Sequence, residues 1–301
     1  MGEYLLVARK WIASPGALSI VTGAMILLPI AVTAICSTFV ASHHPAMQYA
    51  DGLDQDGMPT PPCRRFPFGT DGLGRDVFSR TVHGALTSLT AGLAAACLAS
   101  GIGVVIGLTA GYGGGFIDTV LMRLTDVMMA IPTVLLAMAL AGLMDGQLIW
   151  SHPEIRLERG LITVLVVVGA VSWTGVARVV RTEVRSLVQR PFIEAAEVLG
   201  CSATRVLLTH ILPNIFPSVI VLTTMNTAWT IALEAGLGFL GIGVPPPSPS
   251  WGRMVSEGQP YMLVAPWIVL SSGGAIVATV LACNLIGYGA QAQLDPHRQV
   301  H

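Results

Sequence analysis

The sequence predicts an all-α integral membrane protein with six transmembrane helices. Of its 301 residues, 53% are hydrophobic and only 11% are charged, whereas soluble domains carry about 25% charged residues. So few charges cannot cover a water-facing surface, and we therefore expect lipid to face much of the chain. The hydrophobic residues gather in six long stretches, at about Ala17–Val40, Leu86–Ala110, Val127–Met144, Leu161–Val180, Ile215–Leu233 and Trp267–Gly287.

The first stretch follows Arg9 and Lys10, as the apolar part of a secretion signal would. It is too long for such a signal, and it matches the roughly 20 residues that a helix needs to cross the hydrocarbon layer. Ile35 also stands before Cys36 where lipoprotein cleavage requires a small residue. We therefore expect this stretch to be the first transmembrane helix.

The other five stretches are predicted as helices because lipid offers no partner for backbone N–H and C=O groups, which a helix satisfies internally. The second stretch contains Gly103 and Gly107 in a G-x-x-x-G spacing. Small residues allow membrane helices to approach closely. In a chain with 33 glycines, this spacing also arises often by chance.

The arginine distribution predicts the orientation of the chain in the membrane. Cytoplasmic loops of membrane proteins carry an excess of Lys and Arg. Arg9 and Lys10 precede the first span, and five arginines lie near the end of the fourth span or follow it, at Arg178, Arg181, Arg185, Arg190 and Arg205. Both termini are therefore predicted to be cytoplasmic, and the loops 42–83, 145–160 and 234–266 to lie outside.

The segment after the fourth span is predicted to form two short helices in a cytoplasmic loop. The first helix carries apolar residues on one face, at Phe192, Ala195, Ala196 and Leu199. Gly200 suits the end of this helix, Ser202 can cap the second one, and Pro213 suits the first turn of the next. The small alanines would let another protein approach closely. An ordinary amphipathic surface helix explains the spacing equally well.

This segment resembles the EAA loop of ABC importer permeases, which has the pattern E-A-A, three residues, G, a gap, an apolar residue and L-P. The matching positions are Glu194, Ala195, Ala196, Gly200, Leu212 and Pro213. The resemblance implies a coupling helix seated in a groove of an ATPase subunit, with both alanines and the glycine in close contact and Glu194 in polar contact. Glu194 has a simpler explanation as well, because an acid in the first turn of a helix interacts favourably with the helix dipole.

Three further stretches narrow the family to the C-type permeases of dipeptide and oligopeptide importers. Residues 68–80 resemble its G-T-D-x-x-G-R-D segment, residues 239–252 its F-L-G-x-G-V-x-P-P-x-P-S-W-G loop, and residues 284–296 its closing segment. The motifs occur in order over nearly the whole chain. The chain departs from the family pattern at 84–89, where an arginine is usual after Gly-Ala, and at Tyr288, where an acid is common.

The resemblance implies a MetI-like transmembrane domain at 84–290. It follows a segment 1–83 with the N-terminal tail, first span and outer loop, and it precedes a cytoplasmic tail at 291–301. The implied function is that of a permease subunit of an ATP-driven importer of dipeptides or oligopeptides, in the bacterial inner membrane. The implied partners are a homologous permease, two ABC ATPase subunits and an extracytoplasmic substrate-binding protein, which the proline-rich loop at 236–251 would face.

Two polar residues in the fifth span are candidates for the translocation pathway or a gate, because intramembrane acids and amides tend to mark such sites. These are Asn226 and Glu234. Solvation at the membrane edge or a buried arginine partner explains Glu234 equally well. Arg123 and Asp126, three residues apart, are expected to pair along one helix.

Several other functions are excluded or held as alternatives. Lys10 is the only lysine and follows no glycine-rich loop, so the chain lacks an ATPase phosphate loop. Gly236–Gly241 fits a dinucleotide fingerprint, but it follows a span rather than a strand. His43 and His44 are expected in a solvated loop, and no catalytic, cofactor or metal site is predicted. A nickel or glutathione permease remains an alternative, as does a stand-alone secondary transporter, which should carry titratable groups in both halves of the bundle.

Overall fold

The computed structural model describes residues 16–147 and 154–294, and it describes side chains in these ranges except for 145–159. The expectations for Arg9, Lys10 and the end of the C-terminal tail lie outside the described residues. The membrane-spanning elements are α2 (Ala17–Ile35), α4 (Val77–Gly113), α5 (Gly115–Ala130), α6 (Thr133–Gln147), α7 (Glu154–Val171), α8 (Thr174–Val188), α11 (Leu212–Phe239) and α13 (Trp267–Leu294). Shorter elements are α3 (Ser37–Val40), η1 (Ala50–Gly52), α9 (Pro191–Val198), α10 (Ala203–Arg205), η2 (Val206–Ile211), α12 (Trp251–Gly258) and η3 (Gln259–Tyr261).

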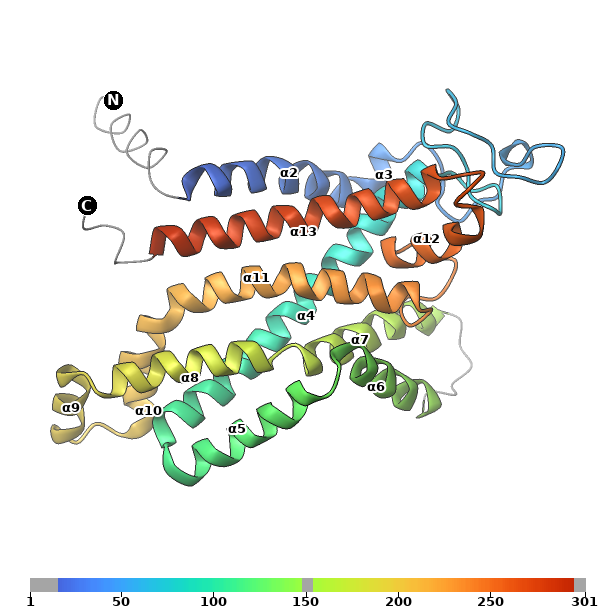
Figure 1. Ribbon diagram of the computed structural model, residues 1–301. Coiled ribbons are helices and arrows are strands. Elements are labelled where there is room, and N and C mark those ends of the chain that lie inside the picture. Colours follow the sequence, from blue (N-terminus) through green and yellow to red (C-terminus); the bar gives the residue numbers. More distant parts are fainter. Residues whose placement is uncertain (1–15, 148–153, 295–301) are drawn as a thin grey trace, which may run out of the picture.

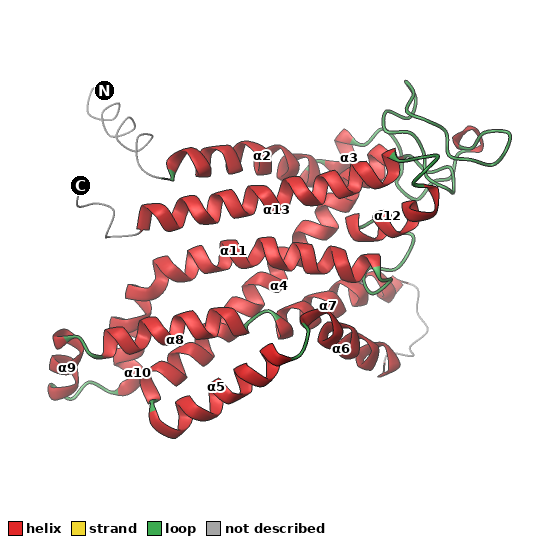
Figure 2. Cartoon of the chain, viewed as in Figure 1, coloured by secondary structure: helices red, strands yellow, loops and turns green. Residues whose placement is uncertain are grey.

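The prediction of an all-α membrane protein is confirmed. Four helices are each long and apolar enough to cross a membrane, and two bent helix pairs bring the number to six if each pair is one span. In the described ranges the chain consists of helices and loops, and the only β-type pairings there are two isolated bridges. The long helices lie side by side in Figure 2, with most of the loop at one end of the bundle.

Helix α4 is the central element of the bundle and packs against α2, α5, α7, α8, α11 and α12. Its 37 residues make it about 55 Å long, well beyond the roughly 30 Å of the hydrocarbon layer. Part of α4 therefore extends out of the membrane. In Figure 1 it runs behind α8 and α11 from one end of the molecule to the other.

A glycine stripe on α4 allows α8 to pack very closely. A Cβ atom on Gly103, Gly107 or Gly111 would lie 2.7 Å from the Cβ atom of Val176, Val180 or Val184, respectively. Carbon atoms pack at about 3.5–4.0 Å, so only glycine fits at these positions. The G-x-x-x-G spacing thus extends by one more turn and forms the contact between the second and fourth spans.

The third and fourth predicted spans are each built from two helices that meet at a bend. The third span breaks between α5 and α6, which are bent by 94°. Pro132 explains this break, because proline lacks the N–H that a helix needs and forces the preceding Ile131 to be extended. The fourth span bends by 43° between α7 and α8, where Ser172 and Gly175, both poor helix formers, flank the break.

The two ends of the bundle differ in their connections. We call the end with α9 the inner end and the end with α12 the outer end, following the predicted orientation. The first described residues of α2 and the last of α13 both lie at the inner end (Figure 1). The loop between α3 and α4 lies at the outer end, beside α12.

The second short helix predicted for the inner loop does not exist as a separate element. Residues Ala203–Phe239 form one continuous helical run, because the three-residue α10 passes through the π-helical turn η2 into α11. Pro213 has no N–H to donate to Thr209, and a π turn is one way in which a helix accommodates such a missing bond. The other two predictions hold, since the Ser202 hydroxyl accepts a bond from the Arg205 N–H and Pro213 lies in the first turn of α11.

Candidate functional site

Helix α9 has a well-defined beginning and end despite its eight residues. Pro191 occupies the first turn, where a missing N–H costs nothing. After the helix, Gly200 has φ of +83°, and two backbone bonds close the end. The Gly200 N–H donates to the Glu197 carbonyl at 2.9 Å, and the Cys201 N–H donates to the Ala196 carbonyl at 3.1 Å. This is the Schellman arrangement, in which glycine is favoured.

The face that α9 turns toward the protein differs from the predicted one. Ile193 is fully buried and Ala196 is 7% exposed, and both pack against a cluster that includes Val206 and Ile211. Ala196 therefore contacts the chain's own core, and close contact with a partner at Ala196 is not available in this conformation. The error arises because α9 is apolar on both sides, so spacing alone does not distinguish its inward face.

The outward face of α9 is apolar and exposed. Glu194, Ala195 and Gly200 are exposed, and so are the large side chains of Phe192, Val198 and Leu199, the last two at 83% and 84%. An exposed apolar cluster of this kind indicates an interaction site. We call these six residues the inner patch.

Few bonds hold α9 to the rest of the bundle. The Tyr112 hydroxyl at the end of α4 donates to the Glu197 carboxylate at 2.9 Å. Leu212, which is half-buried, packs against the same core as Ile193, while Pro213 is exposed. All six residues that matched the EAA pattern thus lie at the inner end, in α9, its closing turn and the first turn of α11.

The outer end contains a buried ion-paired cluster built on Asp71. A tight turn at Asp71–Arg75, with Gly74 at φ of +72°, directs the Leu73 and Arg75 N–H groups to one carboxylate oxygen at 2.9 and 3.0 Å. The other oxygen accepts bonds from the Arg75 Nε at 2.7 Å and from Arg80. Asp71, Arg75 and Arg80 are each no more than 5% exposed.

Glu257 on α12 joins this cluster to the rest of the outer end. One of its carboxylate oxygens accepts a 2.8 Å bond from Arg75 and another from Arg80, and the second oxygen accepts a 3.0 Å bond from Arg253. We call Asp71, Arg75, Arg80, Arg253 and Glu257 the outer cluster. Removing one member of a buried ion pair leaves its partner charged and unpaired, so the cluster fixes the position of α12 relative to α4.

Trp251 fixes the other end of α12. Its side chain is 1% exposed, its indole N–H donates to the Thr81 carbonyl at 3.0 Å, and its backbone N–H donates to the Ser88 hydroxyl at 3.2 Å. Both acceptors belong to α4. Helix α12 is therefore attached to α4 at both of its ends.

The structure places Glu234 inside the protein rather than in an open pathway. Its side chain is 1% exposed and lies close to Ser88, yet neither carboxylate oxygen has a hydrogen bond of standard geometry within the described part of the chain. No arginine pairs with it there. Asn226 is half-buried on the same helix, and its amide nitrogen also lacks a partner among the described residues. Glu234 and Asn226 are eight residues apart, or about 12 Å along the helix, and they do not form one site.

Two other predicted arrangements differ from the structure. Asp126 pairs with Arg178 of α8 at 2.8 Å rather than with Arg123, so the bond joins two spans. His43 is not fully solvated, because its ring is held by the Asp76 carboxylate at 3.2 Å and packs on Tyr49.

Residues 103–300 match the family described as binding-protein-dependent transport system inner membrane component. The chain is 37% identical over 236 residues to the oligopeptide transport system permease protein OppC of Bacillus subtilis (strain 168), covering 78% of this chain and 73% of the relative. It is also 37% identical over 275 residues to the glutathione transport system permease protein GsiD of Escherichia coli O157:H7, covering 91% of this chain and 85% of the relative.

The chain belongs to this family of inner-membrane transport components.

The permease carries its motifs at its two ends. The sequence predicted the functional loop at the inner end but not the ion-paired cluster at the outer end. The inner loop was found from its pattern, although the face was not. The role of residues 69–76 was missed, because the carboxylate that completes their cluster, Glu257, lies far along the chain. A signal was present in the sequence, because residues 71–80 contain two arginines and two acids in a chain with few charges. Charged residues are rarely buried unless they are paired, so this concentration predicts ion pairs.

Proposed function

We propose that this permease forms half of the translocation pathway of an ATP-driven importer of dipeptides or oligopeptides. A homologous permease would supply the other half, and two ABC ATPase subunits and an extracytoplasmic substrate-binding protein would complete the complex. The chain itself would be non-catalytic, with ATP hydrolysed by its partners. The single observation that carries the proposal is the inner patch, an exposed apolar surface on a short helix between two spans.

The inner patch would be the docking surface for an ATPase subunit. Phe192, Val198 and Leu199 expose apolar area that water solvates poorly, and burying it in a groove of a partner is favourable. Ala195 and Gly200 would let the partner approach the backbone, and Glu194 would make a polar contact. Ala196 would not contact the partner, and it would hold α9 in place by packing against the core formed by α8 and α11.

Movement of α9 would reach the spans through α8 and α11, which are connected to it on either side. Helix α8 is packed onto the glycine stripe of α4, and its Arg181 is paired with Asp118 of α5. When ATP closes the ATPase dimer, α9 would therefore move as part of a rigid group of helices. Such rocking switches a central site between the two sides of a membrane.

The proposed orientation places the inner end in the cytoplasm, together with both termini. Support comes from the arginines of α8, since Arg185 lies in the last turn of this helix and Arg181 one turn before it. The outer end, with the loop at 41–76, α12 and the proline-rich loop at 245–249, would then face the substrate-binding protein. We also propose that 84–290 functions as the permease domain, although α4 begins before it at Val77.

Glutathione is a second candidate substrate, because the glutathione permease relative aligns over 91% of this chain. Glutathione is itself a small peptide, so the two candidates require similar pathways. Uptake of labelled dipeptide, competed separately with oligopeptide and with glutathione, distinguishes them in cells that contain the complete transporter. Competition by glutathione but not by oligopeptide would place glutathione, together with dipeptide, among the substrates.

The test of the proposed function is a gentle membrane pulldown of the tagged permease. Ala195→Asp places a charge in the inner patch without straining the backbone, and we expect it to lose the ATPase subunits while keeping the partner permease. Ser186→Asp is the matched control, because Ser186 is exposed on α8 at the same end but outside the inner patch. If the wild type brings down no ATPase, the importer assignment fails and a stand-alone transporter becomes the better explanation.

A further inference from the structure

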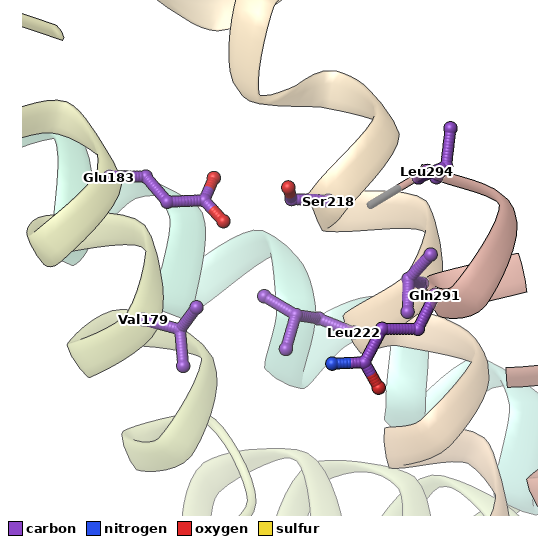
Figure 3. A pocket seen from close by; sticks show the side chains of 7 residues that line it. Val179, Glu183, Ser218, Leu222, Gln291 and Leu294 are labelled. Atoms are coloured by element: carbon purple, nitrogen blue, oxygen red, sulfur yellow. The ribbon is translucent and has the colours of Figure 1, made fainter. Parts of the chain in front are cut away.

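A cavity of about 260 Å³ lies near the inner end, between α8, α11 and α13. Figure 3 shows its lining, in which Glu183 of α8, Ser218 of α11 and Gln291 of α13 extend toward the same space. The rest of the lining is apolar, at Val179, Val221, Leu222 and Leu294. Three helices from distant parts of the chain thus place three polar groups around one small apolar space.

Glu183 is the one acid in this lining and the only group there with a full charge. The other acids near it have cationic or hydroxyl partners: Asp118 pairs with Arg181 and Arg185, Asp126 with Arg178, and Glu197 with Tyr112. Glu183 has no ion pair among the described residues, and Ser218 is its hydrogen-bond partner. Within the described part of the chain, the Glu183 carboxylate is half-buried without a cation, which is unfavourable, so the cavity is suited to receive one.

The polar groups fit a primary ammonium better than a metal ion. An ammonium has three N–H donors, which match the carboxylate of Glu183, the hydroxyl oxygen of Ser218 and the amide oxygen of Gln291. Calcium and magnesium require about six oxygen ligands and usually more than one carboxylate. The apolar lining would contact the carbon atoms that follow the ammonium group.

We propose that this cavity binds a primary ammonium group, and that Glu183 is the residue that recognises it. This inference rests on the proposed function, in which the ammonium is the amino terminus of a peptide leaving the pathway toward the cytoplasm. The headgroup of phosphatidylethanolamine carries the same group and is a second source of the ligand.

The test is equilibrium binding of labelled dialanine to the purified permease–ATPase complex, without nucleotide or binding protein, in nanodiscs of phosphatidylglycerol. The wild type should bind dialanine at least about tenfold more tightly than N-acetyl-dialanine, because a charge-assisted hydrogen bond is lost on acetylation. Glu183→Gln should lose this preference, and Glu183→Asp should keep part of it. Asp126→Asn is the control, since it removes an inner acid outside the cavity and should bind as the wild type does.

The lipid source is tested in nanodiscs that contain phosphatidylethanolamine. If dialanine fails to bind, but phosphatidylethanolamine co-purifies with the wild type and not with Glu183→Gln, the ligand is the lipid headgroup. Equal binding of both dipeptides to the wild type and to Glu183→Gln, with no change in bound lipid, overturns the inference. Ser218→Ala provides a second test if Glu183→Gln does not fold, and it should weaken dialanine binding.

Uptake separates this inference from the proposed function. If proteoliposomes with the complete transporter import peptide while binding is independent of Glu183, only the ammonium site is wrong. If they import no peptide, the proposed function is wrong whatever the binding result.

Discussion

At the outer end, buried arginines and carboxylates join the loop, α4 and α12, whereas at the inner end one hydrogen bond and a small apolar core hold α9. Arg80 is 1% exposed and bonds to two carboxylates, while Leu199 is 84% exposed. The outer cluster thus finds its ionic partners within one chain, although Leu263 at the same end is 99% exposed. The inner patch leaves apolar surface that the proposed ATPase partner would cover.

This difference suggests a division of roles, with a rigid outer end and an inner end that would transmit motion. Buried charges tolerate little displacement, because any separation leaves them desolvated and unpaired. Helix α9 rests on an apolar core that it shares with α8 and α11, so a shift of α9 would carry these helices with it. We therefore expect the outer cluster to move as one block with α4, and α9 to respond to its partner.

The largest effect is expected from breaking the outer cluster. Arg80→Met leaves Asp71 and Glu257 with less positive charge in a buried site. The free energy of unfolding should fall by about 3–5 kcal/mol. The thermal midpoint of the purified complex measures the loss. Arg65→Met is the matched control, because Arg65 and its partner Asp51 are both about half exposed, and its midpoint should hardly move. Equal midpoints for the two variants would show that the outer cluster is not a rigid element.

A smaller effect is expected at the contact that links the two regions. Gly107→Ala adds a Cβ atom 2.7 Å from Val180, and overpacking of this kind costs about 1–3 kcal/mol. The control is Gly101→Ala on the same helix, where nothing lies within 4 Å of the added atom. Adding Val180→Ala to Gly107→Ala should not restore the midpoint, because the Val180 Cβ atom at 2.7 Å and the Ala177 carbonyl oxygen at 2.8 Å both remain. Full recovery would argue against this close approach of α4 and α8.

Gly200→Ala should weaken the end of α9 without any clash. Nothing lies within 4 Å of a Cβ atom there, but φ is +83°, and a left-handed conformation costs about 1–2 kcal/mol in a residue with a side chain. Less ATPase should co-purify, and hydrogen exchange in α9 should become faster. Unchanged exchange in α9 would mean that this turn does not control the helix.

The smallest effect is expected for Tyr112→Phe, which removes the hydrogen bond from α4 to Glu197. Because this bond is partly exposed, its loss should cost about 1 kcal/mol. Amide exchange should rise in α9 alone, while the thermal midpoint stays near that of the wild type. A fall in the midpoint as large as that of Arg80→Met would remove the distinction between the two ends.

The sequence predicted those features of the fold that depend on neighbouring residues. It did not predict features that depend on contacts between residues far apart in the chain. Apolar length identified the spans, and Gly200 and Ser202 were correctly read as the end of α9 and the cap of α10, because capping depends on a few neighbouring residues. The 94° bend had a visible cause in Pro132, yet an apolar run on both sides of a proline reads as one span. The helix α12 was missed because its eight residues are held by Trp251 and Glu257 against another part of the chain.

Three features could be read from the amino-acid sequence alone: the chain lies in a membrane, it is helical, and it carries a loop of the EAA pattern. These follow from composition, from the need to satisfy the backbone in lipid, and from a contiguous motif. Three other features became visible only in the folded bundle: Ala196 faces inward, Glu234 is enclosed by protein, and Glu257 completes the cluster on Asp71. Each of these depends on which helix packs beside which, and residues far apart in the chain meet only after the bundle has formed.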